Sequence, residues 1–278
     1  MTRQPDLARG GTRTITSLQN DRVKLIRSLD MRKVRRETGL FVAEGTSVLV
    51  TARDAGWKPQ MFVVLAGSAA AGIQRELLDW AQDAGAECLE VSEAVLAKLA
   101  AKDNPQTLLA VFEQQWVPKP PTGSLPKDAL WAALEGVRDP GNLGTIIRTV
   151  DAVGASGVAL IGTCVDPYAR EAVRATMGSI FNVPLLRMTL EECLAWASRW
   201  PGDIAGTHLD AKEDFRAGPY RAPALLLMGS EGPGLSPELS AACTRLVKIP
   251  MAGRLDSLNL AVATALMLYE IAKPRLRL

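Results

Sequence analysis

Three loops in the second half of the chain combine glycine, asparagine, arginine and serine at spacings that suit ligand binding. Residues 139–149 are DPGNLGTIIRT, residues 229–234 are GSEGPG, and residues 249–259 begin with IPM and end with SLN. Glycines let a backbone approach a ligand closely and adopt positive φ. A guanidinium offers five donors to a phosphate or an oxyanion. The loops could therefore hold a small molecule and stabilise negative charge beside it.

Each loop follows an apolar run that predicts a buried strand, at residues 130–134, 224–228 and 246–249. The first and third loops lead into amphipathic helices, and the second leads into a short helix opened by Ser236-Pro237-Glu238. In parallel α/β sheets, ligands bind at the carboxyl ends of the strands. We therefore expect the three loops to form one pocket.

The fold class predicted for residues 128–278 is α/β, because strand and helix patterns alternate along them. Two further strands are predicted at 158–161 and 182–186. The predicted helices are 143–153, 168–177, one opened by Thr189 with the capping-box partner Glu192, and 258–271.

A smaller α/β domain is predicted for residues 15–113, followed by a proline-rich extended linker at 114–127. Its strands are expected at 40–43, 61–65, 87–91 and 108–112, and its helices at 21–37, 46–55, 74–84 and 92–100. Residues 1–14 are polar and are predicted to be a flexible N terminus.

The composition is that of a soluble globular protein, with 47% hydrophobic and 22% charged residues among 278. No secretory signal and no membrane-spanning apolar run is visible, which predicts a cytoplasmic location. The cysteines show no C-x-x-C pair, which favours reduced thiols and gives no zinc ligand set. They are Cys88, Cys164, Cys193 and Cys243.

Taken together, the three loops resemble the motifs of the SpoU family of the SPOUT class, which methylates ribose 2′-hydroxyls in RNA with S-adenosylmethionine. The resemblance covers about residues 130–272. It implies a C-terminal trefoil knot, a homodimer formed through the C-terminal domain, and a reaction without metal. The first domain, through Phe41-Val42-Ala43-Glu44-Gly45, resembles the RNA substrate-binding module that precedes the catalytic domain in part of this family.

The resemblance also implies the site residues. The active-site set is Asn142, Arg148, Glu231, Ser257 and Asn259, and the cofactor contacts are Leu227, Gly229, Gly232, Gly234, Ile249, Met251 and Leu258. Arginine is a poor base, so Arg148 is expected to stabilise a phosphate or an oxyanion. By position alone, Asn142 and Ser257 could simply cap helices, and Arg148 could be a solvated helix residue. His208, the only histidine, lies outside the motifs and is expected to be structural.

Seven cations and one acid, Asp30, lie between residues 22 and 36 of a chain whose net charge is only +2. Such a run attracts phosphates, although most charge runs are solvated helix faces. Beside an RNA-methylating domain, we favour RNA contact by Arg22, Lys24, Arg32, Lys33, Arg35 and Arg36, with Arg27 in the same run.

Three alternatives remain open from the sequence. The substrate could be tRNA, although a separate RNA-binding domain favours structured rRNA. The fold could serve a non-catalytic RNA-binding or ribosome-assembly protein, although Arg148 and Asn259 are both present. A nucleotide-dependent dehydrogenase is disfavoured, because G-x-x-G-x-G differs from the dinucleotide fingerprint G-x-G-x-x-G.

Overall fold

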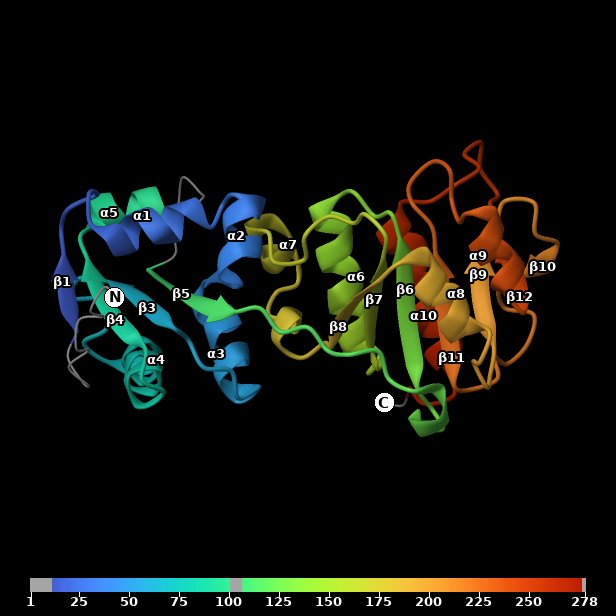
Figure 1. The fold of residues 1–278 in the computed structure, drawn as a ribbon, viewed down its shortest axis with the longest axis horizontal. Helices are drawn as coiled ribbons and strands as arrows, with labels where there is room; N and C mark the ends of the chain where they lie inside the picture. The colour runs from blue at the N-terminus through green and yellow to red at the C-terminus, as the bar shows by residue number, and fades with distance from the viewer. Residues whose placement is uncertain (1–11, 101–106, 277–278) are drawn as a thin grey trace. The chain divides into compact units, whose positions relative to one another are not determined.

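The computed structural model describes residues 12–100 and 107–276 and divides into two units (Figure 1). The first unit contains the described residues up to Gln114 together with Tyr168–Phe181. The second contains Gln115–Pro167 and the described residues from Asn182 onward. The segment 168–181, which we expected within the C-terminal domain, therefore belongs to the first unit.

The first unit has a five-stranded sheet in the order β1-β4-β3-β5-β2. Strands β2 (Leu40–Glu44), β3 (Met61–Leu65), β4 (Glu87–Val91) and β5 (Leu108–Glu113) match the predicted strands within one residue, and β5 runs antiparallel to both neighbours. Strand β1 (Arg13–Ile15) pairs with β4 and corrects the flexible assignment of residues 13 and 14. Residues 1–11 of that predicted N terminus lie outside the described residues.

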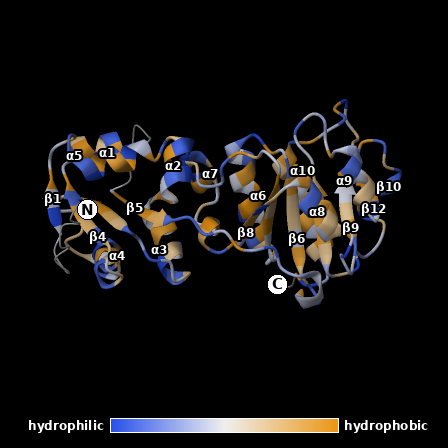
Figure 2. Ribbon diagram, viewed as in Figure 1, coloured by the Kyte–Doolittle hydropathy of each residue, from blue (hydrophilic) through white to orange (hydrophobic). Residues whose placement is uncertain are grey.

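Helices cover both faces of this sheet, whose strands β3 and β5 are hydrophobic (Figure 2). Side chains alternate along a strand, so Met61 and Val63 face the cluster that includes residues of α1 and α5, whereas Phe62 does not belong to it. The helices are α1 (Asp21–Ser28), α2 (Arg32–Thr38), α3 (Thr46–Asp54), α4 (Gly72–Asp83), α5 (Glu93–Leu99) and α7 (Arg170–Ala175).

The single basic helix predicted for residues 21–37 is wrong, because the chain breaks between α1 and α2. Leu29 is buried at the break, and the guanidinium of Arg35 donates to the carbonyl oxygens of Leu29 (2.8 Å) and Asp30 (2.9 Å). These carbonyls lie at the end of a helix, where partners are lacking. Arg35 is only 4% exposed. It therefore serves the fold and is withdrawn from the predicted RNA-binding set.

The segment 168–181 completes the core of the first unit. Tyr168 packs on Phe41 with ring centroids 4.6 Å apart, and Phe181 packs on Phe112 at 5.0 Å. Arg170 and Arg174 of α7 both form ion pairs with Glu44 at the end of β2. Sequence reasoning missed this placement because the segment is distant along the chain from its partners.

The second unit has a seven-stranded parallel sheet in the order β10-β12-β9-β11-β6-β7-β8. Strands β6, β7, β11 and β12 lie where the sequence predicted them, within one residue. Strand β8 begins three residues later than predicted, after Pro184, and β9 and β10 were not predicted. The strands are β6 (Leu130–Glu135), β7 (Gly157–Ile161), β8 (Leu185–Met188), β9 (Ile204–Thr207), β10 (Glu213–Asp214), β11 (Ala224–Met228) and β12 (Arg245–Lys248).

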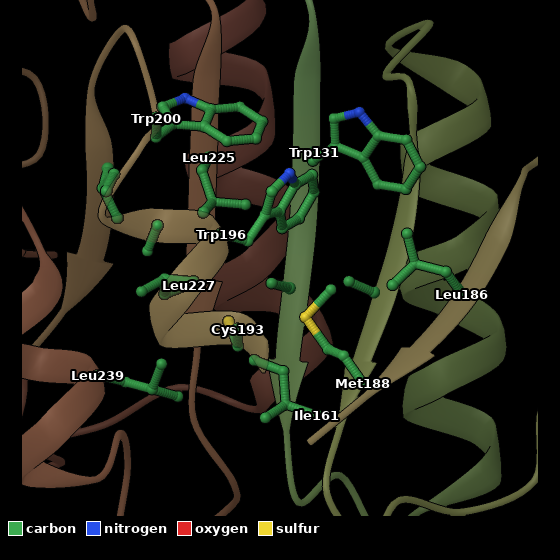
Figure 3. Packing of buried hydrophobic residues seen from close by; sticks show 14 of the residues in the cluster. Trp131, Ile161, Leu186, Met188, Cys193, Trp196, Trp200, Leu225, Leu227 and Leu239 are labelled. Atoms are coloured by element: carbon green, nitrogen blue, oxygen red, sulfur yellow. The ribbon is translucent and has the colours of Figure 1, made fainter. Parts of the chain in front are cut away.

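Helices α6 (Pro140–Ala152) and α10 (Leu260–Ala272) pack together, while α8 (Leu190–Ala197) and α9 (Pro237–Ala242) contribute to the cluster on the other face (Figure 3). The capping box of Thr189 and Glu192 is present as predicted. In the cluster, Trp131 and Trp200 both meet Trp196 edge to face, with centroids 5.7 and 4.9 Å apart.

The proline-rich segment predicted as a linker is held against the second unit. The backbone amide of Val117 donates to the carbonyl of Leu185 at 2.9 Å, and the indole of Trp196 donates to the carbonyl of Pro120 at 3.1 Å. Residues 122–124 form one turn of 3₁₀ helix. The segment therefore has fixed partners within its own unit.

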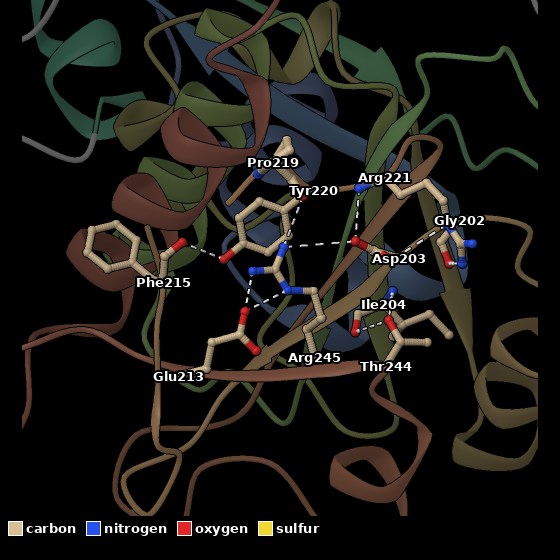
Figure 4. A network of polar contacts seen from close by, with 10 residues as sticks. All are labelled: Gly202, Asp203, Ile204, Glu213, Phe215, Pro219, Tyr220, Arg221, Thr244 and Arg245. Atoms are coloured by element: carbon tan, nitrogen blue, oxygen red, sulfur yellow. Dashed lines mark hydrogen bonds and ion pairs between the residues drawn. The ribbon is translucent and has the colours of Figure 1, made fainter. Parts of the chain in front are cut away.

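A polar network holds the connection between β9 and β11 at the edge of the second sheet (Figure 4). Arg245 donates to Glu213 at 2.9 Å and stacks on the ring of Tyr220 at 4.1 Å. The Tyr220 hydroxyl donates to the carbonyl of Phe215 at 2.7 Å, and burial raises the pKa of Tyr220 to about 12. The network therefore holds residues 213–221, which follow β9 and the short segment 208–210. No helix within the described residues is long and apolar enough to cross a membrane.

Candidate active site

The carboxyl ends of β6, β9, β11 and β12 meet at one edge of the parallel sheet, as the sequence predicted for three of them. A pocket of about 780 Å³ opens there, which is a common size for a ligand site. It is lined by residues of four segments: 207–210, 228–235, 247–251 and 256–263. The second and third predicted loops therefore share one pocket, as expected.

Most of the predicted site residues line this pocket. They are Glu231, Ser257 and Asn259 of the active-site set and Gly229, Gly232, Gly234, Ile249, Met251 and Leu258 of the cofactor set. Leu227 instead is fully buried in the cluster beneath α8. Because side chains alternate along β11, its neighbour Met228 is the one that reaches the pocket.

The glycine loop owes its shape to its own backbone. Gly232 and Gly234 have φ of 94° and 74°, which favours glycine, and the amide of Gly234 donates to the carbonyl of Ser230 at 3.0 Å. A Cβ at Gly229 would lie 1.9 Å from the carbonyl carbon of Gly234. Gly229, which also lines the pocket, is thus required for the loop to fold on itself.

Hydrogen bonds join side chains from all three loops. Asn259 Nδ2 donates to Asn142 Oδ1 at 3.0 Å, and Asn142 Nδ2 donates to Glu231 Oε1. Asn259 Oδ1 in turn accepts from the backbone amides of Ala261 (2.9 Å) and Val262 (3.3 Å). We call this chain of bonds the amide relay. It ties the first loop, which does not line the pocket, to the two loops that do.

Two helix caps differ from the predictions. Helix α6 is capped by Asp139, whose Oδ1 accepts from the amide of Asn142 at 2.6 Å, and Pro140 occupies its first turn. Helix α10 is capped by Asn259 and not by Ser257. The side chain of Asn142 is therefore available for the relay, whereas the side chain of Asn259 both caps α10 and takes part in the relay.

Arg148 lies on the exposed side of α6, nearly two turns after Asn142. It does not line the pocket, and within residues 12–100 and 107–276 no hydrogen bond or ion pair involves its guanidinium. The structure therefore does not bring Arg148 into contact with the rest of the predicted set. Its donors remain for a ligand.

Sequence reasoning missed two groups at this edge. Glu135, the last residue of β6, accepts from the amide of Ser236 at 2.8 Å and so anchors the end of the glycine loop. His208 lines the pocket directly after β9, and its Nδ1 accepts from the amide of Asp210 at 3.2 Å. Recognition of β9 as a strand would have placed His208 at a strand end.

The lining combines apolar side chains with carboxylates. Val247, Ile249 and Met251 offer contacts to a flat apolar ring, while Asp210 and Glu231 favour a positive charge. This lining fits a ligand with both features, such as the adenine and sulfonium of S-adenosylmethionine. Across the part of the chain that the structure describes, no group of three or more His, Cys, Asp and Glu residues is placed to hold a metal ion.

Comparisons with known proteins agree with this geometry. Residues 129–269 match the SpoU rRNA Methylase family, and residues 20–110 match an MRM3-like substrate binding domain. An uncharacterized tRNA/rRNA methyltransferase of Synechocystis sp. is 33% identical, over 92% of this chain and 92% of its own. The 23S rRNA (uridine(2479)-2′-O)-methyltransferase of Streptomyces viridochromogenes is 32% identical, over 89% of this chain and 88% of its own.

A solved structure extends the agreement to three dimensions. The AdoMet-bound rRNA methyltransferase of Sinorhizobium meliloti superposes with a TM-score of 0.87 and 41% identity, covering 96% of this chain and 100% of that one. The predicted fold class is confirmed: a SPOUT α/β domain preceded by a small α/β substrate-binding domain. The chain belongs to the SpoU rRNA methylase family.

Proposed function

We propose that this protein transfers a methyl group from S-adenosylmethionine to a ribose 2′-hydroxyl of ribosomal RNA. The observation that carries the proposal is the pocket at the strand ends, in which the amide relay fixes Glu231 beside two cofactor-type loops. Family membership and the AdoMet-bound relative support the cofactor, and the rRNA substrate named for the Streptomyces relative supports the target.

The chemistry asks the protein mainly for alignment. When bound, S-adenosylmethionine supplies a methyl group activated by its sulfonium. The loops at 229–234 and 249–258 orient the methyl for in-line attack by the 2′-oxygen, and such orientation supplies a large part of a barrier of this kind. Arg148 holds the neighbouring phosphate or the developing oxyanion. Asn142, Glu231, Ser257 and Asn259 complete the proposed active site.

A methylation assay tests the proposal. Purified protein is incubated with radiolabelled S-adenosylmethionine and RNA from a strain lacking the gene, and 16S rRNA, 23S rRNA and tRNA are then separated. We expect label in rRNA at a ribose, detected as a dinucleotide that resists alkaline hydrolysis. Label confined to tRNA would overturn the substrate, and no transfer with intact cofactor binding would favour the non-catalytic alternative.

Cofactor binding depends on Gly229. Gly229→Ala forces the backbone of residues 229–235 to move, and overpacking of this kind costs about 1–3 kcal/mol. We therefore expect S-adenosylmethionine affinity to fall at least ~10-fold by titration calorimetry. Gly123→Ala is the control, because a Cβ there meets nothing within 4 Å and the residue does not line the pocket. Equal affinity in the two variants would remove the glycine loop from the cofactor site.

The exposed cations of the first unit are proposed to hold RNA. Lys24, Arg32, Lys33 and Arg36 are exposed, and Lys24 and Lys33 also pair with Asp21 and Glu37 at 3.7 and 3.9 Å. Arg22 is half-buried and pairs with Glu87 at 2.7 Å. Each phosphate contact contributes about 0.7–0.9 to the slope of log K against log salt. The triple variant Arg32→Gln, Lys33→Gln, Arg36→Gln should thus flatten that slope by about 2 to 3. Arg75→Gln, which removes an exposed cation of α4, should leave the slope unchanged. An equal slope in both variants would mean that the run of cations is a solvated face.

We also propose that the protein forms a homodimer through α10, and that it acts in the cytoplasm, where ribosomal RNA is found. Val262, Leu266 and Tyr269 recur at helical spacing and are 49%, 39% and 51% exposed, beside Thr145 of α6. An apolar patch of this kind marks an interaction surface. Light scattering should give the mass of a dimer for the wild type and of a monomer for Leu266→Glu; the same mass for both would reject this surface.

A further inference from the structure

We infer that the N terminus of α10 sets the direction of the amide relay, so that Asn259 is a positioning residue that orients Asn142 and, through it, the carboxylate of Glu231. This inference deepens the proposed function, because Glu231 lines the proposed cofactor pocket.

The direction follows from groups that can only donate. The backbone amides of Ala261 and Val262 have no acceptor atom, so the atom of Asn259 that faces them must be Oδ1. An asparagine amide is oriented by its hydrogen-bond partners. The Nδ2 of Asn259 therefore points away from the helix and donates to Asn142 Oδ1.

The same reasoning fixes the next residue. Because Oδ1 of Asn142 accepts from Asn259, only Nδ2 remains to meet Glu231, and an ionised carboxylate is an obligatory acceptor. The main chain of Asn142 is held separately by Asp139. The relay thus runs in one direction, from the helix amides to the carboxylate, without conflict between donors and acceptors.

The relay has a consequence for the pocket. Oε1 of Glu231 is engaged by Asn142, while Oε2 accepts no hydrogen bond from the described residues. The relay therefore presents one oxygen of Glu231 to a ligand in a fixed orientation. Asn259 acts on that ligand through Asn142 and Glu231.

Asn259→Asp tests the direction with almost no change in shape. Aspartate caps a helix as well as asparagine does, and its charge suits a helix N terminus. It cannot donate, so Asn142 must turn its Nδ2 toward it and present Oδ1 to Glu231, placing two acceptors face to face. We expect S-adenosylmethionine affinity to fall at least ~10-fold, the scale of one lost hydrogen bond to a charged group.

A second substitution reverses the relay and supplies the decisive control. Glu231→Gln provides an amide that can donate to the turned Asn142, so Asn259→Asp should cost less than ~3-fold in this background. Thermal unfolding of the four proteins gives a readout without cofactor or RNA: Asn259→Asp should lower the midpoint in the wild-type background and not in the Glu231→Gln background. Equal costs in both backgrounds would overturn the inference. If the wild-type protein transfers no methyl group, but Asn259→Asp still has a different effect in the wild-type and Glu231→Gln backgrounds, only the proposed function would be overturned.

Discussion

Arg148→Ala is expected to lower the rate of methyl transfer by at least ~100-fold, as removal of one preorganised donor commonly does, and to leave the affinity for S-adenosylmethionine unchanged. Arg148 is exposed on α6, does not line the pocket, and makes no hydrogen bond or ion pair with the described residues. We therefore expect neither folding nor cofactor binding to depend on it. The loss of Arg148 should therefore affect only the rate of methyl transfer to the ribose of bound RNA.

A second substitution separates the bidentate hydrogen bonding of the Arg148 guanidinium from its positive charge. Arg148→Lys keeps the charge but lacks the bidentate geometry, so it should recover little activity. Arg199→Ala, an exposed arginine just after α8, is the control and should keep the wild-type rate. Single-turnover transfer to rRNA, with calorimetry for the cofactor, measures both quantities. A wild-type rate for Arg148→Ala would show that the active site lies elsewhere.

What the sequence predicted well has a local signature. The apolar runs of β6 and β11 are continuous, as in strands buried on both faces, and parallel pairing within the sheet then brings their loops to the same edge as that of β12. Glycines and asparagines in those loops marked the pocket and the relay. The capping box at Thr189 was predictable because both of its residues lie within one turn.

What the sequence missed depends on contacts between distant residues. Strand β9 is short and contains Gly206, and its assignment depends on pairing with β11 and β12 on either side. Without β9, His208 could not be placed at the pocket. Leu227 was assigned to the cofactor set through the family resemblance, whereas the packed sheet buries Leu227 and places Met228 at the pocket, because the face of a strand changes with every residue.

Burial of charge was equally invisible in the sequence. Arg35 belongs to a run of seven cations, yet it alone among the predicted RNA-binding residues turns inward, because two carbonyls at the break between α1 and α2 need a donor. The arginines of α7 likewise find Glu44 only after the chain returns to the first unit. Removal of Glu44 from its ion pairs with Arg170 and Arg174 is expected to have the largest effect on the stability of this protein.

Glu44→Ala should destabilise the first unit by about 3–5 kcal/mol, the usual result of removing one partner from a buried ion pair. The side chains of Glu44 and Arg170 are 8% and 9% exposed, and that of Arg174 is 26% exposed. Both guanidiniums lose their shared carboxylate, and only Arg170 keeps another, Asp30 at 2.5 Å. With its ion pairs to Glu44 gone, α7 should separate from β2 and expose the aromatic core around Phe41.

The control is Asp79→Ala, which removes an exposed partner of Arg75 at 2.8 Å and should change stability by less than about 0.5 kcal/mol. A chain of two units need not unfold in one step, so the measurement is hydrogen exchange of the amides of β2 and α7. Their protection should fall in Glu44→Ala and persist in Asp79→Ala. Equal protection in the two variants would mean that the aromatic contacts alone hold the segment 168–181, and that the buried charges contribute little to its attachment.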